Sequence, residues 1–240
     1  MKKVAIVQSN YIPWKGYFDM VAAVDEFILF DDVQYTRRDW RNRNQIKTVL
    51  GLQWLTVPVR VRGNYYQRIR DTEIDGVDWA QLHWKTLSQN YRKSKHFLEI
   101  AEWLEPLYLA QSYRHISEMN RIFMEAICRY LNIETKISSS TDYKLCDGKT
   151  ERLIDLCLQA GGSEYISGPA AQSYLKASSF ENKGVTLTWF DYAGYPTYPQ
   201  LWGEFKHQVS ILDLLFNCGS NASAFMLHVK PKRDLLRTCR

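Results

Sequence analysis

Hydrophobic and polar positions along the chain follow two periods, one typical of strands and one typical of helices. The apolar run Lys3–Val7 predicts a buried strand, the polar segment Gln8–Gly16 predicts a loop, and Tyr17–Val24 predicts a helix with one apolar face. The apolar run Glu26–Phe30 predicts a second strand, which two aspartates follow directly. Strand, loop, helix and strand within about thirty residues form a βαβ unit, whose parallel strands place ligands at their carboxyl ends.

Helical spacing dominates the middle third of the chain, and strands alternate with helices in the final third. Apolar and polar residues alternate over Trp54–Arg62, which predicts a half-buried strand, and Pro58 indicates an edge or a bulge there. Apolar residues at helical spacing predict two helices within 79–109, split near 93–95, and a further helix over Ser117–Leu131. Strands are predicted at Glu134–Ser138, Glu164–Ile166 and Val185–Phe190, and helices at Thr150–Ala160, Ala170–Leu175 and Ser210–Phe216.

These elements predict an α/β protein with a parallel-sheet core and a helical insertion at about 79–131. The chain has 240 residues, 45% of them hydrophobic, and it shows no internal repeat and no low-complexity linker. A single domain over 1–240 is therefore the simplest organisation. The segment 230–240 is basic, and we expect it to be a frayed tail.

Composition narrows the class of protein. No stretch approaches the roughly 20 apolar residues of a membrane-spanning helix, and the apolar run after Lys2 and Lys3 is too short for a signal peptide, so we expect a cytoplasmic protein without membrane insertion. The five cysteines form an odd set without a C-x-x-C pair, which predicts neither structural disulfides nor a thiolate zinc site. The net charge of +5 favours acidic ligands without demanding nucleic acid.

The loop after the first strand concentrates hydrogen-bonding groups and aromatic rings at a strand-to-helix junction. Lys15 and the free N–H groups of the following helix could hold a phosphate. Gln8 and Asn10 could orient a polar ligand, and Tyr11 or Trp14 could stack on a base. The structural alternative is an ordinary loop whose aromatic rings cover the edge of the sheet. We favour the functional interpretation, because a merely structural loop seldom combines these residue types.

The strongest sequence signal is the segment 34–47, where four arginines and a lysine alternate with amides and aromatic residues. Arginine captures phosphate or carboxylate through two parallel hydrogen bonds, and amides suit polar ligands. One alternative is a solvated basic face, and another is a surface that contacts RNA. The candidate ligand-binding residues here are Gln34, Tyr35, Arg37, Arg38, Arg41, Asn42, Arg43 and Asn44.

Four further residues are candidates for chemistry or substrate contact. Asp31 and Asp32 follow a strand, so they could hold a metal ion that bridges to phosphate, or act as a base toward an amine. Equally, they could only pair with Arg37 or Arg38. His83 is either catalytic or a packed histidine on a predicted helix. Ser167 stands at a tight turn before a predicted helix, where it could contact substrate, although Pro169 explains the same turn structurally.

Several long motifs match one family. The segments IVQSNYIPWKGYFD and DEFILFDDVQYTRRDWRNRNQIK, with KTERLIDL, YISGPAA and FKHQVSILDLLFNCG, resemble the WbqC-like family over nearly the whole chain. The resemblance implies a setting in bacterial O-antigen (lipopolysaccharide) and other surface-polysaccharide gene clusters. Such clusters often encode enzymes that add formyl, acetyl or aminoacyl groups to nucleotide-linked amino sugars.

We therefore expect an enzyme of surface-polysaccharide biosynthesis that transfers an acyl or aminoacyl group to the amine of a nucleotide-linked sugar. It would be an N-acyltransferase or an ATP-dependent amide ligase. The βαβ unit with its arginines would suit a nucleotidyltransferase-like fold that uses ATP and Mg²⁺, but Pro13–Tyr17 replaces the H-x-G-H signature of such enzymes. The alternative is a nucleic-acid-binding or glycan-binding module without catalysis.

Overall fold

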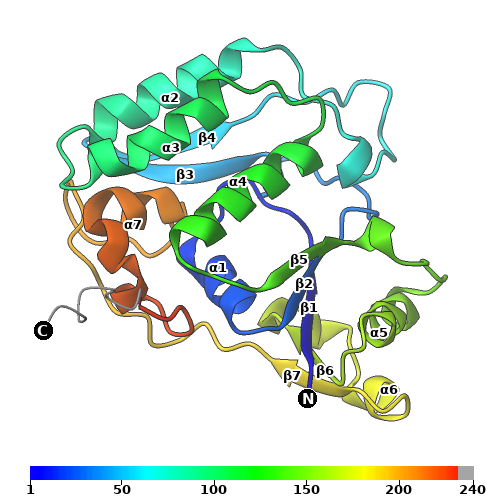
Figure 1. The fold of residues 1–240 in the computed structure, drawn as a ribbon. Helices are drawn as coiled ribbons and strands as arrows, with labels where there is room; N and C mark the ends of the chain where they lie inside the picture. The colour runs from blue at the N-terminus through cyan, green and yellow to red at the C-terminus, as the bar shows by residue number, and fades with distance from the viewer. Residues whose placement is uncertain (232–240) are drawn as a thin grey trace, which may run out of the picture.

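The core of the protein is a five-stranded parallel sheet. In the computed structural model, which describes residues 1–231, the strand order is β5-β2-β1-β6-β7 and all four pairings are parallel (Figure 1). The sheet contains β1 (Lys3–Val7), β2 (Glu26–Leu29), β5 (Lys136–Ser139), β6 (Glu164–Ser167) and β7 (Thr186–Trp189). The predicted α/β class and the parallel βαβ unit are thus confirmed. The order reverses at β1, because β2 and β5 lie on one side of it and β6 and β7 on the other.

Both faces of the sheet are buried, because side chains along a strand point alternately to opposite faces. On one face Val4 and Ile6 pack with the apolar sides of α5 (Lys149–Gln159) and α6 (Ala177–Glu181). On the other face Ala5 packs with helices that include α1 (Lys15–Ala22) and α4 (Ile116–Tyr130). The near-continuous apolar runs of β1 and β2 follow from this burial on two sides.

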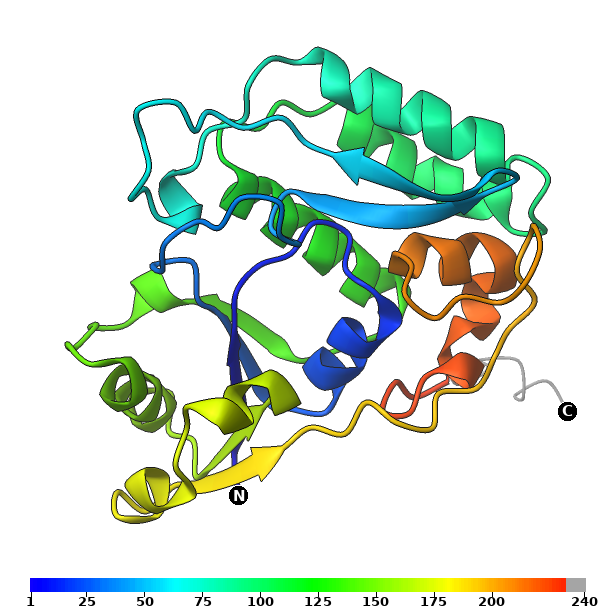
Figure 2. The same cartoon turned by 180° about the vertical axis from the view of Figure 1, so that it is seen from behind.

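A second, antiparallel sheet of two strands lies beside this core. It consists of β3 (Arg43–Thr48) and β4 (Gly51–Thr56), and the helices around it are α2 (Asp78–Tyr91), α3 (Phe97–Leu109) and α7 (Ile211–Cys218) (Figures 1 and 2). The strand predicted over Trp54–Arg62 is therefore wrong in its bounds: it begins earlier and ends at Thr56, two residues before Pro58. The sequence did not predict β3.

The helices of the middle third agree closely with the sequence pattern. The predicted split near 93–95 is confirmed, since α2 ends at Tyr91 and α3 begins at Phe97. The next helix, α4, spans Ile116–Tyr130. In the final third, Pro169–Ser173 forms a short 3-10 helix where an α-helix was predicted, and α6 was not predicted. The predicted basic tail lies almost wholly outside the described residues.

The helix α1 (Lys15–Ala22) fixes the C-terminal part of the chain through two charged side chains one turn apart. The Lys15 ammonium donates to the carbonyl oxygens of Pro196 at 2.9 Å and Phe225 at 3.1 Å. The Asp19 carboxylate accepts from the Tyr195 hydroxyl at 2.8 Å and from two backbone N–H groups at 2.6 and 2.9 Å. The segment after β7 therefore runs along α1 before the chain enters α7 (Figure 2).

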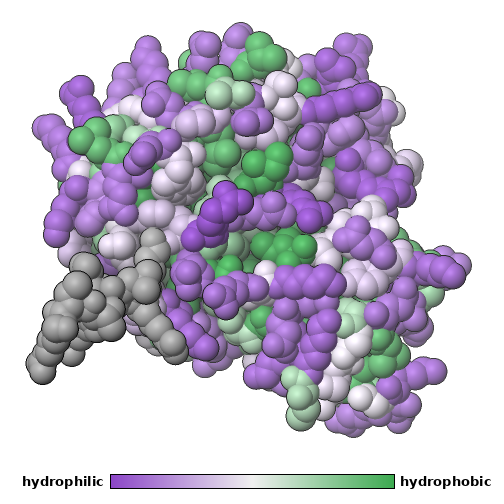
Figure 3. Space-filling model, in the orientation of Figure 1, coloured by the Kyte–Doolittle hydropathy of each residue, from purple (hydrophilic) through white to green (hydrophobic). Residues whose placement is uncertain are grey.

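The outer surface is mostly hydrophilic in the view of Figure 3, where hydrophobic side chains form small, separate patches. Among residues 1–231, no helix has both the length and the apolar character needed to cross a membrane. The apolar faces of the larger helices pack inward instead.

Candidate functional site

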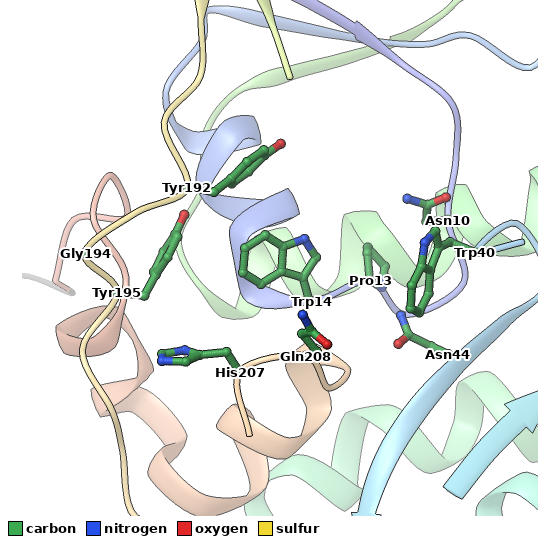
Figure 4. A pocket seen from close by; sticks show the side chains of 10 residues that line it. All are labelled: Asn10, Pro13, Trp14, Trp40, Asn44, Tyr192, Gly194, Tyr195, His207 and Gln208. Carbon is green, nitrogen blue, oxygen red and sulfur yellow. The ribbon is translucent and has the colours of Figure 1, made fainter. Parts of the chain in front are cut away.

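A cavity of about 650 Å³ lies between the loop that follows β1 and the segment that follows β7. Its wall contains amide groups, aromatic rings and one histidine (Figure 4). Both segments leave the carboxyl ends of parallel strands, the edge at which α/β sheets place their ligands. The lining residues are Asn10, Pro13, Trp14, Trp40, Asn44, Tyr192, Gly194, Tyr195, His207 and Gln208.

Trp14 is the central aromatic side chain of the wall. Its indole folds back over Gly16, where an added Cβ would lie 2.3 Å from the ring, so only glycine accommodates this conformation. The ring centroids of Tyr192 and Tyr195 lie 5.3 and 5.6 Å from that of Trp14. In Figure 4 the indole stands between these tyrosines and the side chains of Asn10 and Trp40. The arrangement presents aromatic surface to anything in the cavity.

Two side chains of the arginine-rich segment position the loop after β1. The Asn44 amide donates to the carbonyl oxygens of Tyr11 at 3.1 Å and Ile12 at 3.0 Å, and it holds Ile12 at φ 37°, a conformation that branched residues avoid. The Arg41 guanidinium donates to the Asn10 side-chain oxygen and, at 3.3 Å, to the carbonyl oxygen of the preceding residue. The predicted loop and the predicted arginine segment therefore meet, through Arg41 and Asn44.

His207 and Gln208 complete the wall from the segment before α7. The ring of His207 lies edge-on to Phe205 at 4.6 Å, and among residues 1–231 no hydrogen bond to its ring nitrogens is present. Partial burial and the positive charge of Lys15 lower the pKa of His207, so the imidazole is neutral at pH 7. Sequence reasoning missed both residues, although they lie in the motif FKHQ that contributed to the family resemblance.

Two buried cations lie behind the wall, each with a carboxylate nearby: Asp19 is one turn from Lys15, and Asp39 lies 3.6 Å from Arg41. Burial lowers the pKa of Lys15 to about 8, and its ammonium stands 5.1 Å from the ring centroids of both Tyr195 and Tyr198. Burial also lowers the pKa of Arg41, which nevertheless stays charged because a guanidinium does not deprotonate in proteins. Lys15 does not line the cavity itself, since its ammonium is directed at two carbonyl oxygens.

Comparison with known proteins agrees with the motifs. The sequence model of the WbqC-like protein family matches residues 8–225. The chain belongs to the WbqC-like protein family. An uncharacterized protein of Mycobacterium tuberculosis, Rv1507c, is 57% identical over 240 residues, which is 100% of both chains. No solved structure matches the chain.

In this WbqC-like protein, three predicted site residues are not among those that line the cavity. The Tyr11 hydroxyl is fully buried and hydrogen-bonds His83 Nδ1 at 2.8 Å and the Tyr108 hydroxyl at 2.7 Å. Burial lowers the pKa of His83 to about 4, so it is a neutral histidine of the core. Gln8, the third, uses its backbone carbonyl to accept from Tyr17 at 3.1 Å.

The acidic pair after β2 anchors neighbouring loops. Asp31 is buried and accepts from the Ser9 backbone N–H at 2.8 Å and from the Ser117 hydroxyl. The carboxylate of Asp32 lies 3.1 Å from Arg70 Nε and accepts from the Ser140 hydroxyl at 2.8 Å. Asp31 thus meets the loop after β1, as the topology predicts, whereas Asp32 contacts Arg70 and Ser140 instead. Neither carboxylate is among the residues that line the cavity.

The other predicted residues of the WbqC-like chain bind backbone or surface groups. Tyr35 and Asn42 bond each other at 2.9 Å, while Arg43 stacks on the Trp54 ring at 4.1 Å. Gln34 donates to the Tyr65 carbonyl, Arg37 donates to the Val61 carbonyl, Arg38 is exposed, and Ser167 is buried at the end of β6. Of the predicted set, only Asn10, Trp14 and Asn44 line the cavity.

Metal-binding residue types do not cluster within the described part of the chain. Residues 1–231 contain no group of three or more histidine, cysteine, aspartate or glutamate side chains placed to hold a metal ion. Cys128, Cys146, Cys157 and Cys218 are free thiols, and Cys239 lies outside the described residues. The cavity wall therefore relies on aromatic, amide and imidazole groups.

Proposed function

We propose that this WbqC-like protein is an enzyme of bacterial surface-polysaccharide biosynthesis. In this proposal it transfers an acyl or aminoacyl group to the amine of a nucleotide-linked amino sugar. The cavity is the observation that carries the proposal, because its volume of about 650 Å³ suits a small molecule and its rings suit the flat faces of a sugar or base. The side chains of Asn10 and Gln208 supply polar groups for sugar hydroxyls.

The chemical step needs a base, and His207 is the side chain on the described cavity wall whose usual pKa lies near neutrality, since burial raises the pKa values of Tyr192 and Tyr195. In the proposed reaction the sugar amine attacks the acyl carbonyl carbon and forms the new C–N bond. The neutral imidazole takes the proton that the amine loses and passes it to the leaving group as the acyl–donor bond breaks. The lowered pKa of His207 keeps the imidazole ready for this role at neutral pH.

The groups around the cavity suit a nucleotide sugar and a donor that is already activated. The Arg41 guanidinium bonds the lining residue Asn10, and a positive charge at that place suits a phosphate group. The described lining contains no carboxylate, the ligand type that Mg²⁺ prefers. A thioester or aminoacyl ester therefore suits this wall better as donor than activation by ATP and Mg²⁺.

The test is a turnover screen with the purified protein. Nucleotide-linked amino sugars are incubated with acyl thioesters and aminoacyl esters, and mass spectrometry follows the mass increase of the sugar nucleotide. We expect acylation by the wild type and a loss of kcat of about 10² or more in His207→Asn, the usual contribution of a general base. If no sugar nucleotide binds or reacts while the protein is folded, the proposed function is wrong.

A second candidate function, nucleic-acid binding, is favoured by one surface. Arg37 and Arg38 are exposed beside Tyr65 and Tyr66, whose exposed fractions are 68% and 82%, and the Gln34 amide joins the two segments at 3.0 Å. Exposed cations with aromatic rings suit single-stranded nucleic acid. Binding of a labelled RNA oligomer that weakens steeply with salt, and that Arg37→Ala with Arg38→Ala reduces, would favour this candidate over the enzyme.

A further inference from the structure

Two turns at one end of the molecule expose large apolar side chains. The turn between β3 and β4 carries Val49 and Leu50, which are 67% and 95% exposed, and the first turn of α3 carries Leu98, which is 82% exposed. Figures 1 and 2 show the hairpin turn and the α2–α3 connection at the same end. A hydrogen bond joins the two regions, because the Lys47 backbone N–H donates to the hydroxyl of Tyr91, the last residue of α2, at 3.1 Å.

The hairpin turn does not need these apolar residues for its own geometry. Thr48 makes the turn's local bonds, accepting from the Leu50 N–H at 3.2 Å and donating to the Gly51 carbonyl at 2.9 Å. Gly51, with φ 106°, supplies the left-handed conformation that closes the hairpin. The central positions of a hairpin turn normally hold polar residues. The exposed apolar side chains of Val49 and Leu50 therefore indicate that this turn contacts an apolar partner.

Cations lie at the same end as the exposed apolar residues. The α2–α3 connection contributes Arg92, Lys93 and Lys95, all exposed. Beside them lies a groove of about 640 Å³, lined by both lysines and by amide side chains such as Asn217, with no carboxylate among its described lining residues. The acidic residue next to Leu98 is Glu99, whose carboxylate lies 2.9 Å from His96 Nδ1. The three cations of the connection outnumber this carboxylate.

We propose that this surface, formed by Val49, Leu50 and Leu98 with Arg92, Lys93 and Lys95, docks on an anionic phospholipid bilayer. Apolar tips that enter the headgroup region, ringed by lysine and arginine that face lipid phosphates, are the chemistry of peripheral membrane binding. The groove beside the lysines suits one lipid phosphate. A second copy of this chain fits the surface less well, because the same cations would face one another.

The proposed bilayer-binding surface of the protein continues toward the cavity along β4. Leu52 and Trp54 lie on the same face of that strand and are 40% and 39% exposed. The ring of Trp54 lies 5.4 Å from that of Trp40, which lines the cavity. A membrane-docked protein would therefore present the cavity rim near the lipid headgroups.

The experiment is co-sedimentation of the full chain with vesicles of phosphatidylcholine, alone or with about one third phosphatidylglycerol. We expect binding to the anionic vesicles, weakened by about tenfold in Val49→Ser with Leu50→Ser and in Lys93→Glu with Lys95→Glu. Leu109→Ser is the matched control, since Leu109 is 47% exposed at the opposite end of α3 and should leave binding unchanged. Circular dichroism melts check that every variant folds.

The proposal is overturned if the wild type does not bind anionic vesicles at low salt, or if the two turn variants bind like the wild type. It is also overturned if sedimentation velocity shows self-association that Val49→Ser with Leu50→Ser abolishes, because a second copy would then be the partner. His207→Asn separates this proposal from the proposed enzymatic function. That variant should keep vesicle binding whether or not the protein is an acyltransferase.

Discussion

The replacement Gly16→Ala should move one aromatic side chain into the cavity and leave the fold intact. The added Cβ would lie 2.3 to 2.8 Å from three carbon atoms of the Trp14 indole, so the ring must leave its place. Alanine in a helix gains about 0.5–1 kcal/mol over glycine. The lost contacts of Trp14 with Tyr192 and Tyr195 cost about 0.5–1.5 kcal/mol each. The net destabilisation therefore lies between about zero and 2.5 kcal/mol.

Two measurements follow this change. A destabilisation of that size lowers the Tm of a chain of this length by no more than about 10 °C. The indole N–H resonance of Trp14, assigned with a Trp14→Phe variant, should shift because its two tyrosine neighbours are lost. Binding of the sugar nucleotide found in the turnover screen should weaken by about tenfold or more, which corresponds to about 1.4 kcal/mol.

Gly168→Ala is the matched control. An added Cβ there meets nothing closer than 3.7 Å, so this variant should keep both the Trp14 resonance and ligand binding. The reasoning is refuted if Gly16→Ala leaves the Trp14 resonance and ligand affinity unchanged. It is also refuted if the protein no longer folds, because Gly16 would then serve the fold.

Three further predictions concern charged groups. Asp19→Ala should destabilise the protein by about 3 kcal/mol or more in urea titrations, because it leaves the buried Tyr195 hydroxyl and two backbone N–H groups without their carboxylate. A change below about 1 kcal/mol would contradict the view that Asp19 fixes the C-terminal segments to α1. Burial alone would raise the pKa of Glu26, but hydrogen bonds from Lys2, Tyr143 and Ser138 outweigh it and lower the pKa to about 2. The stability that Glu26 contributes is thus present above its usual pKa of 4.5 and is lost as the pH falls toward 2. In Glu26→Gln the free energy of unfolding should therefore fall less steeply between pH 4.5 and pH 2. An unchanged slope in this range would refute the prediction. The lowered pKa of His207 predicts that the acid limb of the kcat/KM profile has its midpoint below 6.5, the usual value for histidine, whereas a midpoint above pH 7 would exclude His207 as the base.

The fold of the parallel core could be predicted because its signals are local. Buried strands such as β1 are short apolar runs, and long helices such as α4 repeat their apolar residues every three or four positions. The strand β3 escaped prediction because its buried positions include Asn44 and Lys47. Their polar groups are satisfied by distant parts of the chain, which no local pattern reveals.

The lining of the cavity was only partly predictable from the sequence. Asn10, Trp14 and Asn44 stood out because polar and aromatic types gather after β1 and in the arginine-rich segment. Tyr192 and His207 lie far from these residues in the sequence. They reach the same cavity because Lys15 and Asp19 of α1 hydrogen-bond the C-terminal segment. Sequence reasoning also took several amides and cations for ligand-binding groups, whereas Asn42, for example, donates to the Val57 carbonyl at 2.7 Å.

The hydrogen bonds by which Lys15 and Asp19 of α1 fix the last third of the chain bear on how the cavity assembles during synthesis. One wall, with Asn10 and Trp14, leaves the ribosome long before the opposite wall, with Tyr192 and His207. A nascent chain that ends before β7 already contains four of the five parallel strands, yet it has no second wall. In such a chain the Asp19 carboxylate lacks its partners, the Tyr195 hydroxyl and two backbone N–H groups, so nothing from the later segment is fixed to α1. The incomplete chain is therefore more open to proteolysis than the finished one.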